Sequence, residues 1–136
     1  MSKVEYISRE TMKPLIEPYG LSEAVRVGQM LHIAGQTGLD EQHQLVEGGL
    51  KAQARQAFRN IKAIIELAGG QAENLVHLTW YLADGPEPRP FLEDATEVLA
   101  AKTEILPGIK PGSTAVRVKA LLTPDLLIEI QAIAAL

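Results

Sequence analysis

The segment from Leu50 to Ala68 carries the pattern that most restricts the fold of this chain. Its apolar residues recur at helical spacing and share one side of the predicted helix: Leu50, Ala54, Ala57, Phe58, Ile61, Ile64, Ile65 and Ala68. Gly69 and Gly70 follow at once, as expected where a helix needs a left-handed residue after its last turn. A helix with one apolar stripe must bury that stripe, so the rest of the chain has to supply a layer that covers it.

A β-sheet is the layer that the flanking segments predict. Short runs rich in β-branched and aromatic residues, bounded by Gly, Pro or Asp, predict strands. They are Val4–Ser8, Ala24–Val27, Met30–Ala34, Val76–Ala83, Ser113–Leu121 and Leu126–Ala134. The dipeptide Gly28-Gln29 between the second and third runs is typical of a two-residue hairpin turn.

A second helix is predicted from Pro90 to Leu106, because proline is tolerated in a first helical turn and Pro107 prevents continuation. The segment Pro14–Leu21 is expected to be irregular. The resulting order, β-β-β-α-β-α-β-β, predicts an α+β fold in which both helices pack on one face of a mixed sheet. No internal repeat or linker interrupts the chain, so residues 1–136 are expected to form a single domain.

The second face of this sheet also needs a cover. In the strand 76–83, Leu78, Trp80 and Leu82 lie on one side, while Thr79 and Tyr81 lie on the other. A strand with large side chains on both faces is poorly suited to face water. We therefore expect oligomerisation, with clefts between the subunits.

Composition excludes several kinds of function. The chain has no cysteine, which excludes disulfides, thiolate metal sites and a cysteine nucleophile and fits a reducing compartment. Its start is charged and no apolar run reaches membrane-spanning length, so we expect a cytoplasmic protein without membrane contact. A net charge of -4 disfavours nucleic-acid binding, and the row Arg55, Arg59 and Lys62 is expected to be a solvated helix face.

Few residues in the chain could carry chemistry. The last strand alternates Glu129 and Gln131 with Ile128 and Ile130, and on pattern alone Glu129 is a solvated strand residue. The three histidines are scattered, so no metal site is expected. The segment 35–38, Gly-Gln-Thr-Gly, is either a strand-end turn or backbone that a ligand approaches closely.

Six segments carry a resemblance to a known family. In chain order they are 18–19, Pro-Tyr; 31–36, Leu-His-Ile-Ala-Gly-Gln; 53–64, from Gln-Ala-Arg-Gln-Ala to Asn-Ile-Lys-Ala-Ile; 79–84, Thr-Trp-Tyr-Leu-Ala-Asp; 111–116, Pro-Gly-Ser-Thr-Ala-Val; and 128–134, Ile-Glu-Ile-Gln-Ala-Ile-Ala. Each motif is weak alone, but their ordered combination resembles the YjgF-like or Rid (reactive intermediate deaminase) family over nearly the whole chain.

The resemblance implies a chorismate-mutase-like fold and a homotrimer with three small-molecule clefts between subunits. Family members of the deaminase type hydrolyse enamines or imines, such as 2-aminoacrylate, to a keto acid and ammonia without metal or cofactor. By motif position, Glu129 orients or activates the attacking water, Tyr19 closes the cleft with its hydroxyl, and Gly35 presents backbone to the ligand. Ser113 and Thr114 are the other expected ligand-binding residues. An older description of the family as ribonucleases fits this acidic chain poorly.

Two departures from the deaminase pattern are expected to change the substrate. Ser113 stands where deaminases carry an arginine that grips the substrate carboxylate, and Ala95 aligns with a deaminase asparagine. A neutral hydroxyl cannot replace that charge, and losing such a pair costs about 2 to 5 kcal/mol of binding. Arg117 is about 13 Å along the strand from Ser113, too far to substitute, and is expected to be an exposed cross-strand charge.

The leading hypothesis is therefore a Rid-type hydrolase, a deaminase if ammonia is released, that acts on a small imine, enamine or related metabolite without the usual carboxylate recognition. The rival hypothesis is a non-catalytic member of the same fold, in which Ser113, Thr114 and Glu129 only recognise a metabolite. RNA cleavage is a third hypothesis, which the sequence disfavours because it shows no basic and aromatic surface.

Overall fold

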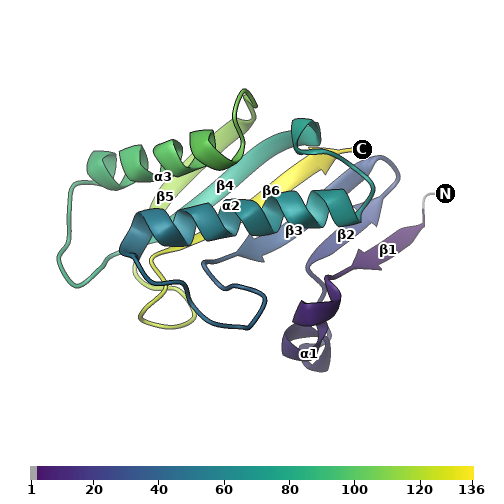
Figure 1. Cartoon of the computed structure of the whole chain (residues 1–136), viewed down its shortest axis with the longest axis horizontal. Helices are drawn as coiled ribbons and strands as arrows, with labels where there is room; N and C mark the ends of the chain where they lie inside the picture. The colour runs from purple at the N-terminus through teal and green to yellow at the C-terminus, as the bar shows by residue number, and fades with distance from the viewer. Residues whose placement is uncertain (1–2) are drawn as a thin grey trace.

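A six-stranded sheet covered on one face by two long helices forms the body of the protein, as the computed structural model shows for residues 3–136 (Figure 1). The strands are β1 (Val4–Ile7), β2 (Ala24–Val27), β3 (Met30–Gln36), β4 (Leu75–Ala83), β5 (Gly112–Val118) and β6 (Ile128–Ala135). The α-helices are α1 (Lys13–Ile16), α2 (Gly49–Leu67) and α3 (Phe91–Ile105). Short 3-10 turns occupy η1 (Glu10–Met12), η2 (Glu17–Tyr19) and η3 (Ala72–Asn74).

The strands lie in the order β1-β2-β3-β6-β4-β5, so the last strand of the chain is in the middle of the sheet. Strands β4 and β5 are parallel, and every other neighbouring pair is antiparallel. The predicted hairpin is confirmed: Val27 pairs with Met30 around a turn in which Gly28 has a φ of 61°. A glycine is favoured there because it adopts positive φ without a steric penalty.

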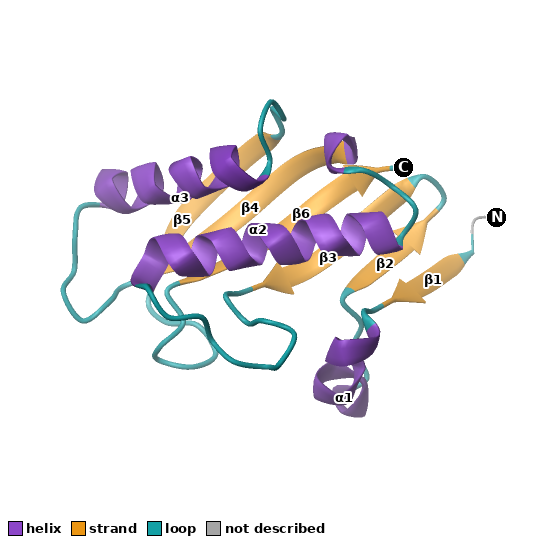
Figure 2. Cartoon of the chain, viewed as in Figure 1, coloured by secondary structure: helices purple, strands orange, loops and turns teal. Residues whose placement is uncertain are grey.

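The core lies between the sheet and the helices. All eight residues of the predicted stripe on α2 and its C-cap are buried, which confirms the helical pattern. They pack against the inward side chains of the central strands, among them Leu31, Leu82 and Ile128. The prediction that both helices cover the same face is also confirmed (Figure 2).

Four predictions of secondary structure, three on strand ends and one on the segment 14–21, were wrong. Strand β5 ends at Val118 rather than Leu121, and β6 begins at Ile128 rather than Leu126, because the segment between them forms a turn rather than pairing. The segment predicted as irregular, 14–21, is mostly helical: Pro14 lies in the first turn of α1, where its missing N–H costs nothing. Strand β3 continues two residues further than predicted, to Gln36.

The opposite face of the sheet has no helix over it in the part of the chain that the structure describes. Large side chains are exposed there, including Val4, Tyr6 and Val116, with exposed fractions of 54%, 79% and 44%. We call this surface the open face. Within residues 3–136 every helix is too short or too polar to cross a lipid bilayer.

Candidate functional site

Glu129 lies on the open face near the centre of the sheet. Strand β6 buries Ile128, Ile130 and Ala132 beneath the helices, so the alternation turns the intervening Glu129 to the other side. The carboxylate is half-buried, and this burial raises the pKa of Glu129 above its ordinary value. A glutamate with a raised pKa is a better general base near neutral pH than a fully solvated one.

A side chain of α2 fixes the start of this strand. Gln53 is buried, and its Nε2 donates a hydrogen bond to the carbonyl of Asp125 at 3.0 Å. Its Oε1 accepts a hydrogen bond from the backbone N–H of Leu127 at 2.9 Å. These two bonds tie the turn before β6 to the helix layer and so set which residues of β6 face outward.

Gly35 faces Glu129 from the neighbouring strand. The pairing of β3 with β6 shifts register between Ile33 and Gln36, which leaves Gly35 in an irregular stretch beside the carboxylate. A Cβ atom at position 35 would lie 2.3 Å from Oε2 of Glu129, far inside van der Waals contact. Glycine is therefore required for Glu129 to keep this position, so the two residues expected to share a site are in contact.

Tyr81 also lies beside Glu129, and no sequence pattern singles it out as a site residue. It pairs with Glu129 across β4 and β6, and its hydroxyl donates a hydrogen bond to Oε1 of Gln131 at 3.1 Å. Only the pairing of these strands, which are 45 or more residues apart in the chain, reveals this neighbour. Glu129, Gln131 and Tyr81 together give the open face a group of hydrogen-bonding side chains.

Ser113 is on the other face of the sheet. It pairs with Leu78, which is buried beneath the helices, and its Oγ accepts a hydrogen bond from Nε1 of the buried Trp80 at 2.7 Å. Thr114, the next residue of edge strand β5, pairs with Thr79 and faces the open side. Within one chain, Ser113 and Glu129 therefore do not line a common cleft.

Tyr19 ends the η2 turn and has an exposed fraction of 79%. A buried ion pair holds its segment: Arg9 contacts Glu23 through Nη2 and Oε2 at 2.7 Å. Arg9 also donates from Nη1 to Oδ1 of Asn60 at 3.2 Å, and Asn60 donates to the carbonyls of Thr37 and Leu39, just after β3.

This network was missed from the sequence, because nothing in the local pattern distinguishes Arg9, Glu23 or Asn60 from solvated polar residues. Its effect is to connect two parts of the expected site. Glu23 accepts a hydrogen bond at its carbonyl from the N–H of Ala34, beside Gly35. The segment that carries Tyr19 and the strand that carries Gly35 are thus attached to one buried cluster.

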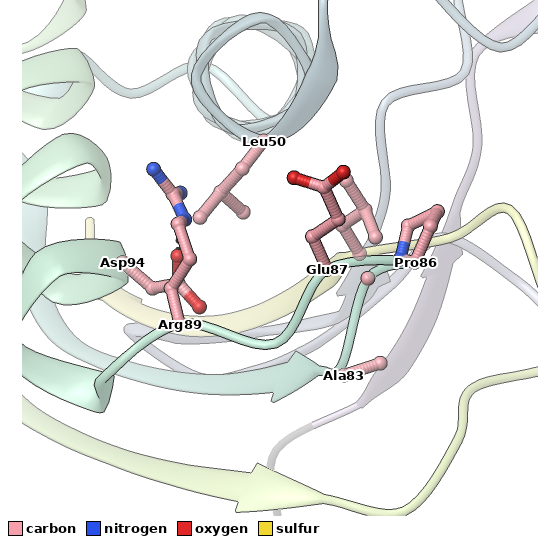
Figure 3. A pocket seen from close by; sticks show the side chains of 8 residues that line it. Leu50, Ala83, Pro86, Glu87, Arg89 and Asp94 are labelled. Carbon is pink, nitrogen blue, oxygen red and sulfur yellow. Dashed lines mark hydrogen bonds and ion pairs between the residues drawn. The ribbon is translucent and has the colours of Figure 1, made fainter.

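A separate cavity of about 340 Å³ lies at the end of β4, between the N-terminal ends of α2 and α3 (Figure 3). Leu50, Glu87, Arg89 and Asp94 line it. Arg89 contacts both Asp94 and Glu97 at 2.5 Å. Arg89 and Asp94 thus form an ion pair within the chain, and none of the expected site residues lies in this cavity.

Arg117 belongs to the same ion-pair cluster, and its predicted role was wrong. Its Nη2 lies 2.9 Å from Oδ2 of Asp94 on α3, and its guanidinium lies over the Phe91 ring at 5.6 Å. Arg117 points to the helix side of β5, because it pairs with the buried Leu82. It therefore joins the sheet to α3 instead of forming an exposed cross-strand pair.

No group of three or more His, Asp or Glu side chains is placed to hold a metal ion within residues 3–136. His32 and His77 flank Ile133 on the open face, and Nε2 of His43 lies 2.7 Å from the carbonyl of Thr11. The open face thus carries two histidines as well as oxygen-bearing side chains, and Glu129 is its half-buried carboxylate.

The fold is that of the chorismate-mutase-like α+β class, with its helices on one face and a half-buried glutamate on the other. Comparisons with known proteins agree. A family model described as endoribonuclease L-PSP matches residues 12–136. A RutC family protein of Pyrococcus abyssi is 36% identical over 135 residues, 98% of each chain.

Two further relatives carry more specific names. The 2-iminobutanoate/2-iminopropanoate deaminase of Mus musculus is 42% identical over 79 residues, 57% of each chain. The crystal structure of RidA from the Antarctic bacterium Psychrobacter is similar with a TM-score of 0.74 and 37% identity, covering 85% of this chain and 88% of that one. The chain belongs to the L-PSP family, also called the YjgF or Rid family.

Proposed function

We propose that this protein hydrolyses a small enamine, imine or related metabolite in a cleft between the subunits of a homotrimer, with Glu129 handling the water. The observation that carries the proposal is the half-buried carboxylate of Glu129, with its raised pKa, held against Gly35. Relatives named as 2-iminobutanoate/2-iminopropanoate deaminases support the reaction type.

The reaction needs little beyond a positioned base. Protonation of an enamine at carbon gives the iminium ion, which is the protonated imine and is electrophilic at carbon. Glu129 accepts a proton from water as the water oxygen bonds to that carbon, and it returns the proton to the nitrogen. The carbon–nitrogen bond then breaks as the hydroxyl proton passes to the departing ammonia, so the products are a carbonyl compound and ammonium. All atoms balance with water as the one co-reactant, so we assign no metal or cofactor to the step.

The arrangement of the faces supports an assembly. Because Ser113 points to the helix side and Glu129 to the open side, a cleft lined by both requires β5 of one chain beside the open face of another. The exposed Val4, Tyr6 and Val116 give that open face apolar surface to bury. The exposed Tyr19 is then available to cover a cleft at the same junction.

The test uses imines generated from several amino acids by an amino-acid oxidase, with their disappearance followed in the presence and absence of the protein. Glu129→Gln is expected to lower the rate by about 10² to 10⁴, the usual contribution of a general base. Glu41→Gln, a change at an exposed loop carboxylate, is the matched control and should leave the rate unaltered. An unchanged rate in Glu129→Gln would rule out the catalytic assignment.

A non-catalytic metabolite-binding protein is the alternative, and the neutral Ser113 hydroxyl in place of an arginine favours it. It predicts that neither the unmodified protein nor Glu129→Gln accelerates the hydrolysis of any imine in the series.

The endoribonuclease description belongs to the family as a whole. Here Arg55 in the basic row on α2 is neutralised by Glu104 at 2.7 Å, and that hydrogen bond is the main reason that the pKa of Glu104 falls to about 2. RNA binding should be absent even at low salt, where phosphate contacts are strongest.

A further inference from the structure

Trp80 and Ser113 border a cavity of about 220 Å³ between α3 and the edge of the sheet, on the helix side. Apolar side chains dominate its lining, and they include Phe58, Leu78 and Leu99. An apolar cavity of about 150 Å³ is large enough to hold a benzene ring in other proteins. This one therefore has room for a branched or aromatic group of a ligand.

The charges around the cavity all have one sign. Lys102 and Lys110 are the ionisable residues among those that line it, and no acidic side chain does so. Lys102 donates from Nζ to the carbonyl of Ile109, so this ammonium is held at the cavity wall. Lys110 is exposed at the opening. A ligand that suits these surroundings has an apolar body and one negative charge.

Ser113 is placed to hold the polar end of such a ligand. Its Oγ already accepts the hydrogen bond from Nε1 of Trp80, which leaves the hydroxyl proton for an acceptor outside. Ser113 is exposed and lies on edge strand β5, the strand that the proposed assembly brings beside Glu129 of another chain.

We propose that this cavity binds an apolar monocarboxylate, with the side chain beside Trp80 and the carboxylate at Ser113 and the two lysines. The inference rests on the proposed function in one respect: it makes the substrate an imine of a large apolar amino acid instead of a two- or three-carbon one. The cation lost at position 113 is then replaced in part by Lys102 and Lys110.

Trp80 supplies the assay, because it is the one tryptophan of the chain and lines the cavity. Its fluorescence is titrated with saturated acids of increasing length, from propionate to hexanoate, and with 3-phenylpropionate. Each added methylene is expected to tighten binding about fourfold until the cavity is full. The uncharged 3-phenylpropanol should bind about tenfold more weakly than 3-phenylpropionate, since it lacks a hydrogen bond to a charged group. A fluorescence response that is absent, or that does not depend on chain length, would overturn the proposal.

Two variants test whether the acids that change the Trp80 fluorescence bind in this cavity. Leu99→Phe adds bulk inside the cavity and should weaken 3-phenylpropionate binding about tenfold or more. Leu92→Phe makes the same change on an exposed part of α3 outside the cavity, where Leu92 is 76% exposed, and should have no effect. Equal weakening in both variants would contradict the location. Thermal unfolding of both variants checks that each is folded.

The result of the acid-binding test can be distinguished from the result of the imine-hydrolysis test. If the acids bind with the expected dependence on length but no imine is hydrolysed faster, the catalytic proposal fails and the cavity stands. If small imines are hydrolysed in a Glu129-dependent way but the acids do not perturb Trp80, the cavity proposal fails and the catalytic one stands.

Discussion

Replacing Gly35 with alanine should move the Glu129 carboxylate without removing it. The added Cβ would lie 2.3 Å from Oε2, 2.7 Å from Cδ and 2.8 Å from Cγ of Glu129, whereas ordinary contacts begin at 3.4 Å. The carboxylate oxygen must therefore retreat by about 1 Å. A general base has to lie within about 2.6 to 3.2 Å of the proton it abstracts, and a misplacement of about 1 Å can cost 10²-fold in rate. We expect Gly35→Ala to lower kcat/KM for imine hydrolysis by about 10²-fold.

Stability should change little in the same variant. Gly35 lies in extended strand backbone that alanine adopts without strain, and the added Cβ would meet only side-chain atoms of Glu129, which can turn away toward the open face. The free energy of unfolding, measured with urea, should change by less than about 1 kcal/mol. Gly85→Ala is the matched control: its new Cβ would meet Leu127 Cδ2 at 3.5 Å, an ordinary contact, so activity and stability should both be retained.

A double-mutant cycle tests whether Gly35 acts through Glu129. If it does, adding Gly35→Ala to Glu129→Gln should lower the residual rate no further. A rate for Gly35→Ala equal to that of the unmodified protein would refute the reasoning. A second 10²-fold loss in the double variant would show that position 35 acts on the substrate independently of Glu129.

Three further predictions concern Glu129, Asn60 and Ser113. The folded protein holds the proton on Glu129 more tightly than the unfolded chain does, so ionisation of this residue lowers the stability of the fold. In a pH profile, kcat/KM should therefore fall on the acid side at a higher pH than an ordinary glutamate would give. The stability of Glu129→Gln relative to the unmodified protein should rise as the pH increases from the pKa of Glu129 in the unfolded chain through its pKa in the folded protein, and should then level off. Asn60→Ala leaves two loop carbonyls without their donor and should lower the free energy of unfolding by about 2 to 4 kcal/mol in urea denaturation, while Gln56→Ala, which removes one partly buried hydrogen bond, should cost under about 1 kcal/mol. Ser113→Arg should raise kcat/KM for 2-iminopropanoate at least about tenfold by supplying a charge for its carboxylate, and a rate no higher than that of the unmodified protein would show that this position does not limit activity on small imino acids.

Elements with strong periodicity were predictable, and so was the face of the element on which each of their side chains lies. The stripe of α2 and the alternation in β6 depend on local spacing, so the burial of Ile61 and Ile128 and the outward position of Glu129 could be inferred without pairing information. Strand and helix ends were less predictable, because β5 stops at Val118 where pairing with β4 stops, at Ala83. The end of β5 is therefore set by the length of its partner strand β4, and no residue within β5 marks it.

The candidate site was predictable only in part. Motif resemblance pointed to Gly35 and Glu129, and the structure places them in contact. The sides of the sheet on which Ser113 and Glu129 lie depend on the register of β4 with both β5 and β6, which the sequence of one strand does not contain. Arg117 shows the same limit, since its ion pair with Asp94 depends on where α3 lies over the sheet.

The surroundings of the half-buried Glu129 differ from those of the two buried acidic residues described in the structure, Glu23 and Asp94. Glu23 contacts Arg9 and Asp94 contacts Arg89, so the charge of each is balanced by a cation at 2.7 Å or less. The pKa of Glu129 is raised by burial, which opposes its ionisation. A fold under selection for stability alone would gain by placing glutamine there. A half-buried carboxylate beside a glycine that alanine could not replace without displacing it suits the proton transfer that we propose.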